Sequence, residues 1–253
     1  MVAPKGGALM GAVNEFVDYV TTASHWWGDR GILHRSIEHM RVSGAAVLAA
    51  GAISLPAATF LGHVKRGGVV AQALVNIGRA VPSYALLAIL FPLSLQYGFG
   101  LGFWPTLAVM FLLAIPPMFT NTYVGVRDVD PAIVEASRGM GMGGWQVLWK
   151  VETPIALPLI LTGVRIAFVQ VIATATLGGF FGLNALGSYL FEGRAQQNDA
   201  LLLTGAVSVA LLAILTELVF SVLARRATPW LAISGRPDVI PPDVVLSTKG
   251  PTE

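Results

Sequence analysis

Residues 80–126, AVPSYALLAILFPLSLQYGFGLGFWPTLAVMFLLAIPPMFTNTYVGV, contain no charged side chain. A helix needs about 20 apolar residues to cross a bilayer, so this run is long enough for two crossings. The whole chain of 253 residues is 55% hydrophobic and 12% charged, whereas soluble domains average about 25% charged. The sequence therefore predicts an all-α integral membrane protein and excludes a soluble enzyme or a disordered protein. Continuous rather than alternating apolar runs also disfavour a β-barrel.

The apolar segments predict five membrane-spanning helices, and a sixth in the N-terminal segment stays open as an alternative. The five spans are residues 42–62, 69–96, 103–125, 154–180 and 200–224.

Prolines interrupt several of these spans, among them Pro82 in the second and the Pro116–Pro117 pair in the third. A proline removes a backbone donor and kinks a helix. These residues are either ordinary kinks of membrane helices or parts of a helix bundle that lines a moving pathway. The sequence leaves both interpretations open.

The chain divides into three segments. Residues 1–41 mix polar and apolar positions and carry two adjacent tryptophans, which favour the headgroup level, so we expect an interfacial segment. Residues 42–227 form the membrane domain, which includes the charged loop 126–153. Residues 228–253 contain five prolines and are predicted to be a flexible cytoplasmic tail.

The basic residues of the connections predict the orientation, because cytoplasmic loops carry an excess of Lys and Arg. With five spans, one side holds seven basic residues and the other holds only Arg194. We therefore expect the N-terminus outside and the C-terminus in the cytoplasm, although basic residues of segment 1–41 argue mildly against this. The seven are Lys65, Arg66, Arg127, Arg138, Lys150, Arg225 and Arg226.

The charged loop 126–153, VRDVDPAIVEASRGMGMGGWQVLWKVET, has local signals for helices. Asp130 and Pro131 form an N-cap and N1 pair, and glycines from 139 onward end the first helix. A second short helix is expected over 145–151, and Thr153 with Pro154 is a second N-cap and N1 pair that would start the fourth span.

The first loop helix has an apolar stripe at helical spacing, made of Ile133, Val134, Ser137 and Met140. Glu135 and Arg138 are close enough in the helix to pair. Such a helix can lie on lipid, which favours a basic polar face. This loop has three basic and four acidic residues, a balance that better suits docking into a groove of another protein.

Glu135-Ala136-Ser137, then Gly141, then Val151-x-Thr153-Pro154 resembles the EAA loop of permease subunits of binding-protein-dependent ABC importers. Ser137 replaces the second Ala of the family pattern, Val151 the Ile and Thr153 the Leu. With the span layout, the resemblance covers roughly residues 40–227. It implies a type I ABC importer permease fold and a loop that couples to an ATPase. The implied coupling residues are Pro131, Ile133, Val134, Glu135, Ala136, Ser137, Met140, Gly141 and Pro154.

The resemblance also implies partners. These are an ATPase dimer inside, an extracellular or periplasmic substrate-binding protein, and a second permease copy or a paralogous permease, all in a bacterial inner membrane with its lipid. The chain has no G-x-x-x-x-G-K-[ST] motif, so ATP and Mg²⁺ would bind the ATPase. No cofactor, metal site, catalytic residue or nucleic acid is expected for this chain.

Three longer segments resemble the osmoprotectant branch of the family. They are AVPSYALLAILFPL, PPMFTNTYVGVRDVDPAIVEASRGMGM and KVETPIALPLILTGVRIA. The resemblance implies import of glycine betaine, choline, carnitine or proline-type solutes. Permeases for other small solutes, such as methionine or sulfonates, share the loop and remain an alternative.

Charges and aromatic residues within the spans suggest a translocation pathway, since a charge inside a bilayer is costly and usually functional. Glu217 is expected near the cytoplasmic face in an interfacial or interhelical contact. Tyr84, Tyr97, Phe103 and Trp104 can form a cation–π site, but an aromatic belt at the membrane boundary is the favoured interpretation. The pathway candidates are Arg79, Pro82, Tyr84, Pro116, Pro117 and Arg165.

Two other classes of protein fit less well. A secondary transporter or channel would show inverted repeats with matched broken helices, and the sequence shows no such match. An intramembrane enzyme needs a cluster of catalytic groups. The predicted spans offer a single carboxylate, Glu217, and no histidine.

Overall fold

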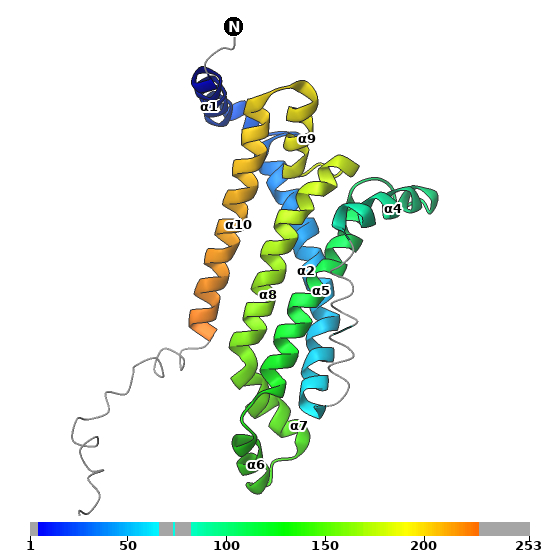
Figure 1. Cartoon of the computed structure of the whole chain (residues 1–253), viewed down its shortest axis with the longest axis vertical. Coiled ribbons are helices and arrows are strands. Elements are labelled where there is room, and N and C mark those ends of the chain that lie inside the picture. Colours follow the sequence, from blue (N-terminus) through cyan, green and yellow to red (C-terminus); the bar gives the residue numbers. More distant parts are fainter. Residues whose placement is uncertain (1–4, 66–72, 74–81, 228–253) are drawn as a thin grey trace, which may run out of the picture.

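The computed structural model describes residues 5–65, 73 and 82–227, and all the regular elements in these residues are helices (Figure 1). In chain order they are α1 (Lys5–Thr21), η1 (Ala23–Trp26), α2 (Ile32–Val64), α4 (Ser83–Gln96), α5 (Phe103–Arg127), α6 (Pro131–Gly139), α7 (Gly144–Val147), η2 (Leu148–Glu152), α8 (Thr153–Ala175), η3 (Thr176–Phe181), α9 (Leu186–Gln196) and α10 (Asp199–Ala227).

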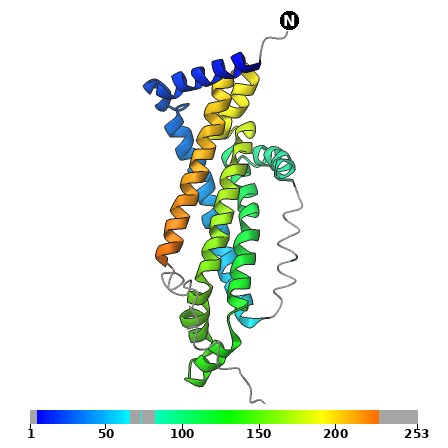
Figure 2. The same ribbon diagram turned by 60° about the vertical axis from the view of Figure 1, so that its left-hand side comes forward.

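Four helical segments are long and apolar enough to cross a membrane: α2, α5, the continuous segment Gly144–Phe181, and α10. They confirm the predicted spans 42–62, 103–125, 154–180 and 200–224. Most of the first half of the predicted span 69–96 lies outside the described residues. Its second half is α4, an apolar helix of 14 residues and so about 21 Å long. It lies at the side of the bundle, at a steep angle to the long helices, in Figures 1 and 2.

Helix α2 begins at Ile32, ten residues before the predicted start of the first span. Arg35 and His39 lie inside this extension, and both are buried. The Arg35 guanidinium donates to both carboxylate oxygens of Glu192 (3.0 and 2.7 Å), and the His39 ring Nε2 lies 2.9 Å from the Ile172 carbonyl oxygen. These two polar residues do not end helix α2, because α9 supplies a partner for Arg35 and α8 supplies one for His39.

The N-terminal helix α1 runs across the end of the bundle, next to α9 and the start of α10 (Figure 2). Tyr19 and Val20 pack there against the cluster of Ile32, Leu186, Tyr189 and Leu201. The indole N–H of Trp26 donates to the Val20 carbonyl oxygen at 2.7 Å. Helix α1 is therefore held against the membrane domain by apolar packing, and the hydrogen bond ties η1 back to α1.

Helices α2, α5 and α8 form the centre of the bundle and pack closely at glycines. A Cβ atom on Gly163 of α8 would lie 2.8 Å from the Pro117 carbonyl oxygen and 2.9 Å from the Cβ of Asn121 on α5. A Cβ atom on Gly62 of α2 would lie 2.9 Å from the Cβ of Val126. Small residues let membrane helices approach this closely, and the packing replaces a hydrophobic driving force that lipid does not provide.

We predict that Gly163→Leu destabilises the protein by about 1–3 kcal/mol or more, because the side chain has to push α8 away from α5. Gly44→Leu is the matched control, since a Cβ atom at Gly44 meets nothing within 4 Å. The measurement is thermal unfolding in detergent. Equal losses of stability in the two variants would contradict the close packing of α5 against α8.

Candidate functional site

The charged loop 126–153 forms the end of the molecule opposite α1 and α9 (Figure 1). It begins at the C-terminus of α5, where Arg127 Nε donates to Asp128 Oδ1 at 2.6 Å. This hydrogen bond holds the pKa of the Asp128 carboxyl below its usual range. The Arg127 guanidinium also lies 5.2 Å from the ring centroid of Tyr123. These contacts fix the direction in which the chain leaves α5.

The first loop helix, α6, begins as predicted. Asp130 is the N-cap, its Oδ1 accepts a hydrogen bond from Ala132 N at 2.8 Å, and Pro131 occupies the first turn. A side-chain acceptor satisfies one of the free amides at a helix N-terminus, and proline fits the first turn because its missing N–H is not needed there. This local chemistry explains why a nine-residue helix starts directly after α5.

The C-terminus of α6 is closed by a Schellman motif around Gly141. Gly141 N donates to the Arg138 carbonyl oxygen at 2.9 Å, and Met142 N donates to the Ser137 carbonyl oxygen at 3.2 Å. The φ angle of Gly141 is +86°. This left-handed conformation is favourable for glycine and costly for residues with a Cβ atom, so the turn depends on glycine at this position.

The predicted N-cap at Thr153 is wrong, because the helix does not restart there. Thr153 has helical φ and ψ angles of −63° and −45°, and its amide donates to the Leu148 carbonyl oxygen within the π-helical turn η2. Pro154 has no amide hydrogen to continue an α-helical ladder. The wider turn lets the chain pass through this proline, so α7, η2 and α8 form one continuous segment from loop to membrane.

The apolar stripe of α6 is divided between two environments. Val134 and Ser137 are buried, and Val134 packs against Val129 and Val147. Ile133 and Met140 point away and are 44% and 77% exposed. The remaining implied coupling residues of α6 are also exposed: Pro131, Glu135 and Ala136. The inner half of the stripe therefore holds α6 to its own chain, and the outer half is free.

Two tryptophans add to the apolar surface at this end. Trp145 is 66% exposed and Trp149 is 50% exposed, and their rings meet edge to face with centroids 5.6 Å apart. We call Ile133, Met140, Trp145 and Trp149 the outer loop surface. Exposed apolar groups gathered at a charged loop are typical of a protein contact site.

A polar cavity of about 300 Å³ lies between α6 and the C-terminus of α2. The Glu135 and Arg138 side chains both line it, and in the part of the chain that the structure describes no ion pair joins them. The cavity is lined by His63, Val64, Lys65, Pro131, Val134, Glu135, Arg138 and Glu152.

The cavity contains a contact that the sequence did not predict. Glu152, in the π turn, is 1% exposed, and its Oε2 lies 2.5 Å from Nδ1 of His63 near the end of α2. A buried carboxylate requires a hydrogen-bond donor, and His63 supplies one. The pair therefore connects α2 to the turn through which the loop continues into α8. The sequence signal was a carboxylate two residues before a membrane-entering proline.

The pathway candidates do not form a single site. Arg165 Nε donates to Glu217 Oε2 at 2.7 Å, an interhelical contact of the kind expected for Glu217. Tyr84 contacts the rings of Phe180 and Phe181 instead. Pro116 and Pro117 are buried within α5, Pro82 is the N-cap of α4, and Arg79 lies outside the described residues.

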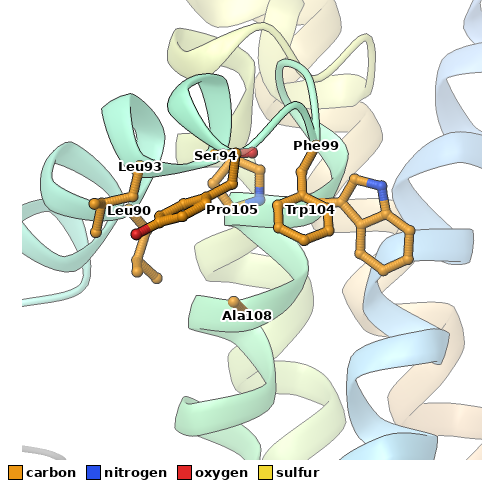
Figure 3. A pocket seen from close by; sticks show the side chains of 8 residues that line it. Leu90, Leu93, Ser94, Phe99, Trp104, Pro105 and Ala108 are labelled. Atoms are coloured by element: carbon orange, nitrogen blue, oxygen red, sulfur yellow. The ribbon is translucent and has the colours of Figure 1, made fainter.

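An apolar pocket of about 280 Å³ lies where α4 turns into α5 (Figure 3). Tyr97 and Trp104 line it together with Phe99, but Tyr84 and Phe103 of the predicted aromatic set do not. Tyr97 and Trp104 are 70% and 52% exposed. The described residues that line the pocket include no charged group, so they offer nothing to bind a substrate carboxylate. An aromatic belt at the membrane boundary remains the better interpretation.

A family model described as "Binding-protein-dependent transport system inner membrane component" matches residues 50–229. The chain belongs to this family. The match includes the charged loop and the helices α5, α8 and α10 complete, so the resemblance of the Glu135–Gly141–Pro154 pattern is confirmed at the level of the family. The chain is thus a multi-pass membrane subunit of a transporter.

Relatives in the family carry transport functions in their names. The chain is 34% identical over 198 residues to the glycine betaine/carnitine/choline transport system permease protein OpuCB of Bacillus subtilis, which covers 78% of this chain and 89% of the relative. It is 34% identical to the carnitine transport permease protein OpuCB of Listeria monocytogenes (78% and 88%). It is 28% identical to the osmoprotectant import permease protein OsmY of Salmonella typhimurium (78% and 83%).

Solved structures with the same fold include the MetNI methionine ABC transporter in inward-facing conformations. The TM-score is 0.69 at 23% identity, covering 78% of this chain and 96% of that chain. An amino acid ABC transporter with histidines has a TM-score of 0.61 at 16% identity, covering 89% and 100%. These likenesses confirm the expected type I ABC importer permease fold.

We predict that Gly141→Ala weakens the turn after α6 by about 1–2 kcal/mol, the cost of a left-handed conformation for a residue with a Cβ atom. Gly139→Ala is the matched control. A Cβ atom at either glycine meets nothing within 4 Å, but Gly139 is helical, so alanine there should be neutral or favourable. Hydrogen exchange of the loop amides measures both. Equal protection in the two variants would refute the role of Gly141.

We predict that His63→Ala destabilises the protein by about 1–3 kcal/mol, because the buried Glu152 carboxylate loses its donor. Glu152→Ala should cost a similar amount, and the double variant should cost less than the sum of the two. The measurement is a double-mutant cycle of unfolding free energies. Strict additivity would mean that the two side chains do not interact.

Proposed function

We propose that this chain is the membrane-spanning permease subunit of an ATP-driven importer for a small osmoprotectant, such as glycine betaine, carnitine or choline. The observation that carries the substrate class is the 34% identity over 198 residues to a glycine betaine/carnitine/choline permease. A methionine or other amino acid importer is supported only by structural likeness at 23% identity or below. A sequence identity that low indicates a shared fold and does not indicate a shared substrate.

The charged loop is the docking site of a separate ATPase dimer. The outer loop surface and the exposed Glu135 and Ala136 of α6 would contact the ATPase. The inner contacts of Val134 and Ser137 keep α6 attached to the permease. A helix held on one face and free on the other suits insertion into a groove of a partner. ATP and Mg²⁺ would bind in the ATPase.

The end of the bundle that carries α6 is the cytoplasmic end, and the end that carries α1 and α9 faces outward. Basic residues of the connections favour this orientation, and two of the four N-terminal cations that argue against it are paired with acidic side chains. Arg35 is paired with Glu192 and Arg41 with Glu38. The C-terminus after α10 would then be cytoplasmic, and a substrate-binding protein would deliver substrate near α9.

The path of coupling runs from α6 through η2 to α8. Movement of α6 by the ATPase would reach α7 through the contact of Val134 with Val147. It would then pass to the π turn and α8, since the helix continues without interruption from Gly144 to Phe181. The His63–Glu152 contact would pass part of the movement to α2. Together with a second permease copy or a paralogous permease, α2, α5 and α8 would then switch access between the two faces.

The test is to reconstitute the chain with its ATPase and binding protein in proteoliposomes and to measure uptake of labelled glycine betaine, carnitine, choline and proline. We expect ATP-dependent uptake of at least one quaternary ammonium compound. Uptake of methionine with none of these four would overturn the substrate class, and uptake that does not depend on ATP would overturn the importer.

We predict that Met140→Glu lowers transport and substrate-stimulated ATP hydrolysis together, by about tenfold, because a charge at an apolar contact must be desolvated on docking. The protein should still insert in the membrane. Met10→Glu is the matched control, since Met10 on α1 is 72% exposed against 77% for Met140 and lies at the opposite end. Unchanged coupling in Met140→Glu would exclude the outer loop surface from the ATPase contact.

A further inference from the structure

A groove at the middle of the membrane domain brings opposite charges together. Arg165 follows Pro154 by eleven residues, about 16 Å along α8, and Glu217 of α10 meets it there. The cavity has a volume of about 440 Å³. It is lined by Thr162, Arg165, Ile166, Val169, Gln170 and Glu217.

The lining comes almost entirely from one face of α8. The spacing is the helical i, i+3, i+4, i+7 and i+8 pattern of residues 162, 165, 166, 169 and 170. The neutral polar side chains, Thr162 and Gln170, lie at the two ends of this face, and Arg165 lies between them. Helix α10 contributes only Glu217. The groove therefore places two opposite charges and two neutral polar side chains, Thr162 and Gln170, among apolar residues of α8.

The ion pair is not sealed inside the chain. The side chains of Arg165 and Glu217 are 42% and 39% exposed. Charges exposed to hydrocarbon at this depth are unfavourable, and charged residues within spans face a bundle interior or a water-filled cavity. Half-exposed charges this far along a membrane-spanning helix thus indicate that the groove faces a polar passage in the assembled transporter, and not lipid.

We propose that the groove is a transient binding site for a zwitterion that carries a quaternary ammonium and a carboxylate, such as glycine betaine or carnitine. The proposal rests on the proposed function. The Arg165 guanidinium would bind the substrate carboxylate as a bidentate hydrogen-bond donor. The Glu217 carboxylate would face the quaternary ammonium, which has no hydrogen to donate and is attracted by charge alone.

The ion pair suits a transient binding site, because the Arg165 and Glu217 charges neutralise each other when no substrate is bound. A zwitterion replaces the Arg165–Glu217 contact with two contacts of the same kind, so binding exchanges one neutral arrangement for another. The exchange opposes tight binding, and conduction requires that a substrate can also leave. Neither side chain is left uncompensated in either state, which is the condition for placing charges at this depth.

Choline provides the discriminating comparison, because it carries the same quaternary ammonium and no carboxylate. We expect Arg165→Gln to lower the maximal uptake rate of glycine betaine by about tenfold or more, the usual effect of losing a charge-assisted hydrogen bond. Choline uptake should stay within about twofold of the wild-type rate. Glu217→Gln should lower both rates, since both substrates carry the cation. Rates are measured in proteoliposomes with saturating substrate-loaded binding protein and equal amounts of inserted permease.

Arg225→Gln is the matched control. It removes an exposed arginine of α10, the helix that carries Glu217, at a position outside the groove, and it should change neither rate. If Arg165→Gln lowers betaine and choline uptake by the same factor, Arg165 has a structural role only and the binding site is overturned, while the proposed function stands. The binding site is also overturned, and the proposed function stands, if the wild-type importer transports choline but no zwitterion. If the wild type moves neither, the proposed function fails and this inference fails with it.

Discussion

The rest of the structure depends on one constraint, which is that a charge placed within a membrane must find a partner inside the protein. Arg35 lies within α2 because Glu192 of α9 accepts hydrogen bonds from both of its terminal nitrogens and Asn184 accepts one from its Nε. Arg165 of α8 is held by Glu217 of α10, and Glu152 at the entry to α8 is held by His63 of α2. Each pair joins helices that are distant in the sequence, so the few charges of the domain also determine which helices lie together.

The close packing of the helices also connects the charged loop mechanically to the membrane domain. Helices approach at Gly163 and Gly62 so closely that side chains cannot intervene, which leaves α2, α5 and α8 as one packed unit. The loop is not a flexible appendage of that unit. Its inner residues Val134 and Val147 pack together, and η2 carries the helix past Pro154 without a break. Force applied to α6 therefore reaches the membrane through the packing of Val134 on Val147 and then through the continuous helical backbone that begins at Gly144.

Much of the fold was predictable from the sequence, because spans and caps follow local rules. The apolar runs located four of the five predicted spans, and Asp130–Pro131 located the start of α6. Errors arose where tertiary partners override the local rule. Thr153 has the chemistry of an N-cap, yet the preceding turn is already helical and supplies the hydrogen bond that a cap would make. The start of α2 was placed too late because the partners of Arg35 are about 150 residues away.

The candidate site was predictable as a segment but not as a surface. Helical spacing put Ile133, Val134, Ser137 and Met140 in one stripe, and spacing alone does not reveal how much of a stripe the chain covers for itself. Val129 and Val147 bury its inner edge, whereas the described residues leave Met140 77% exposed. A helix whose stripe was wholly buried would have nothing to offer a partner, and one wholly exposed would not be held in place when pushed. The division of the stripe satisfies both requirements, which is why the outer edge, and not the whole helix, is the part to expect in contact with the ATPase.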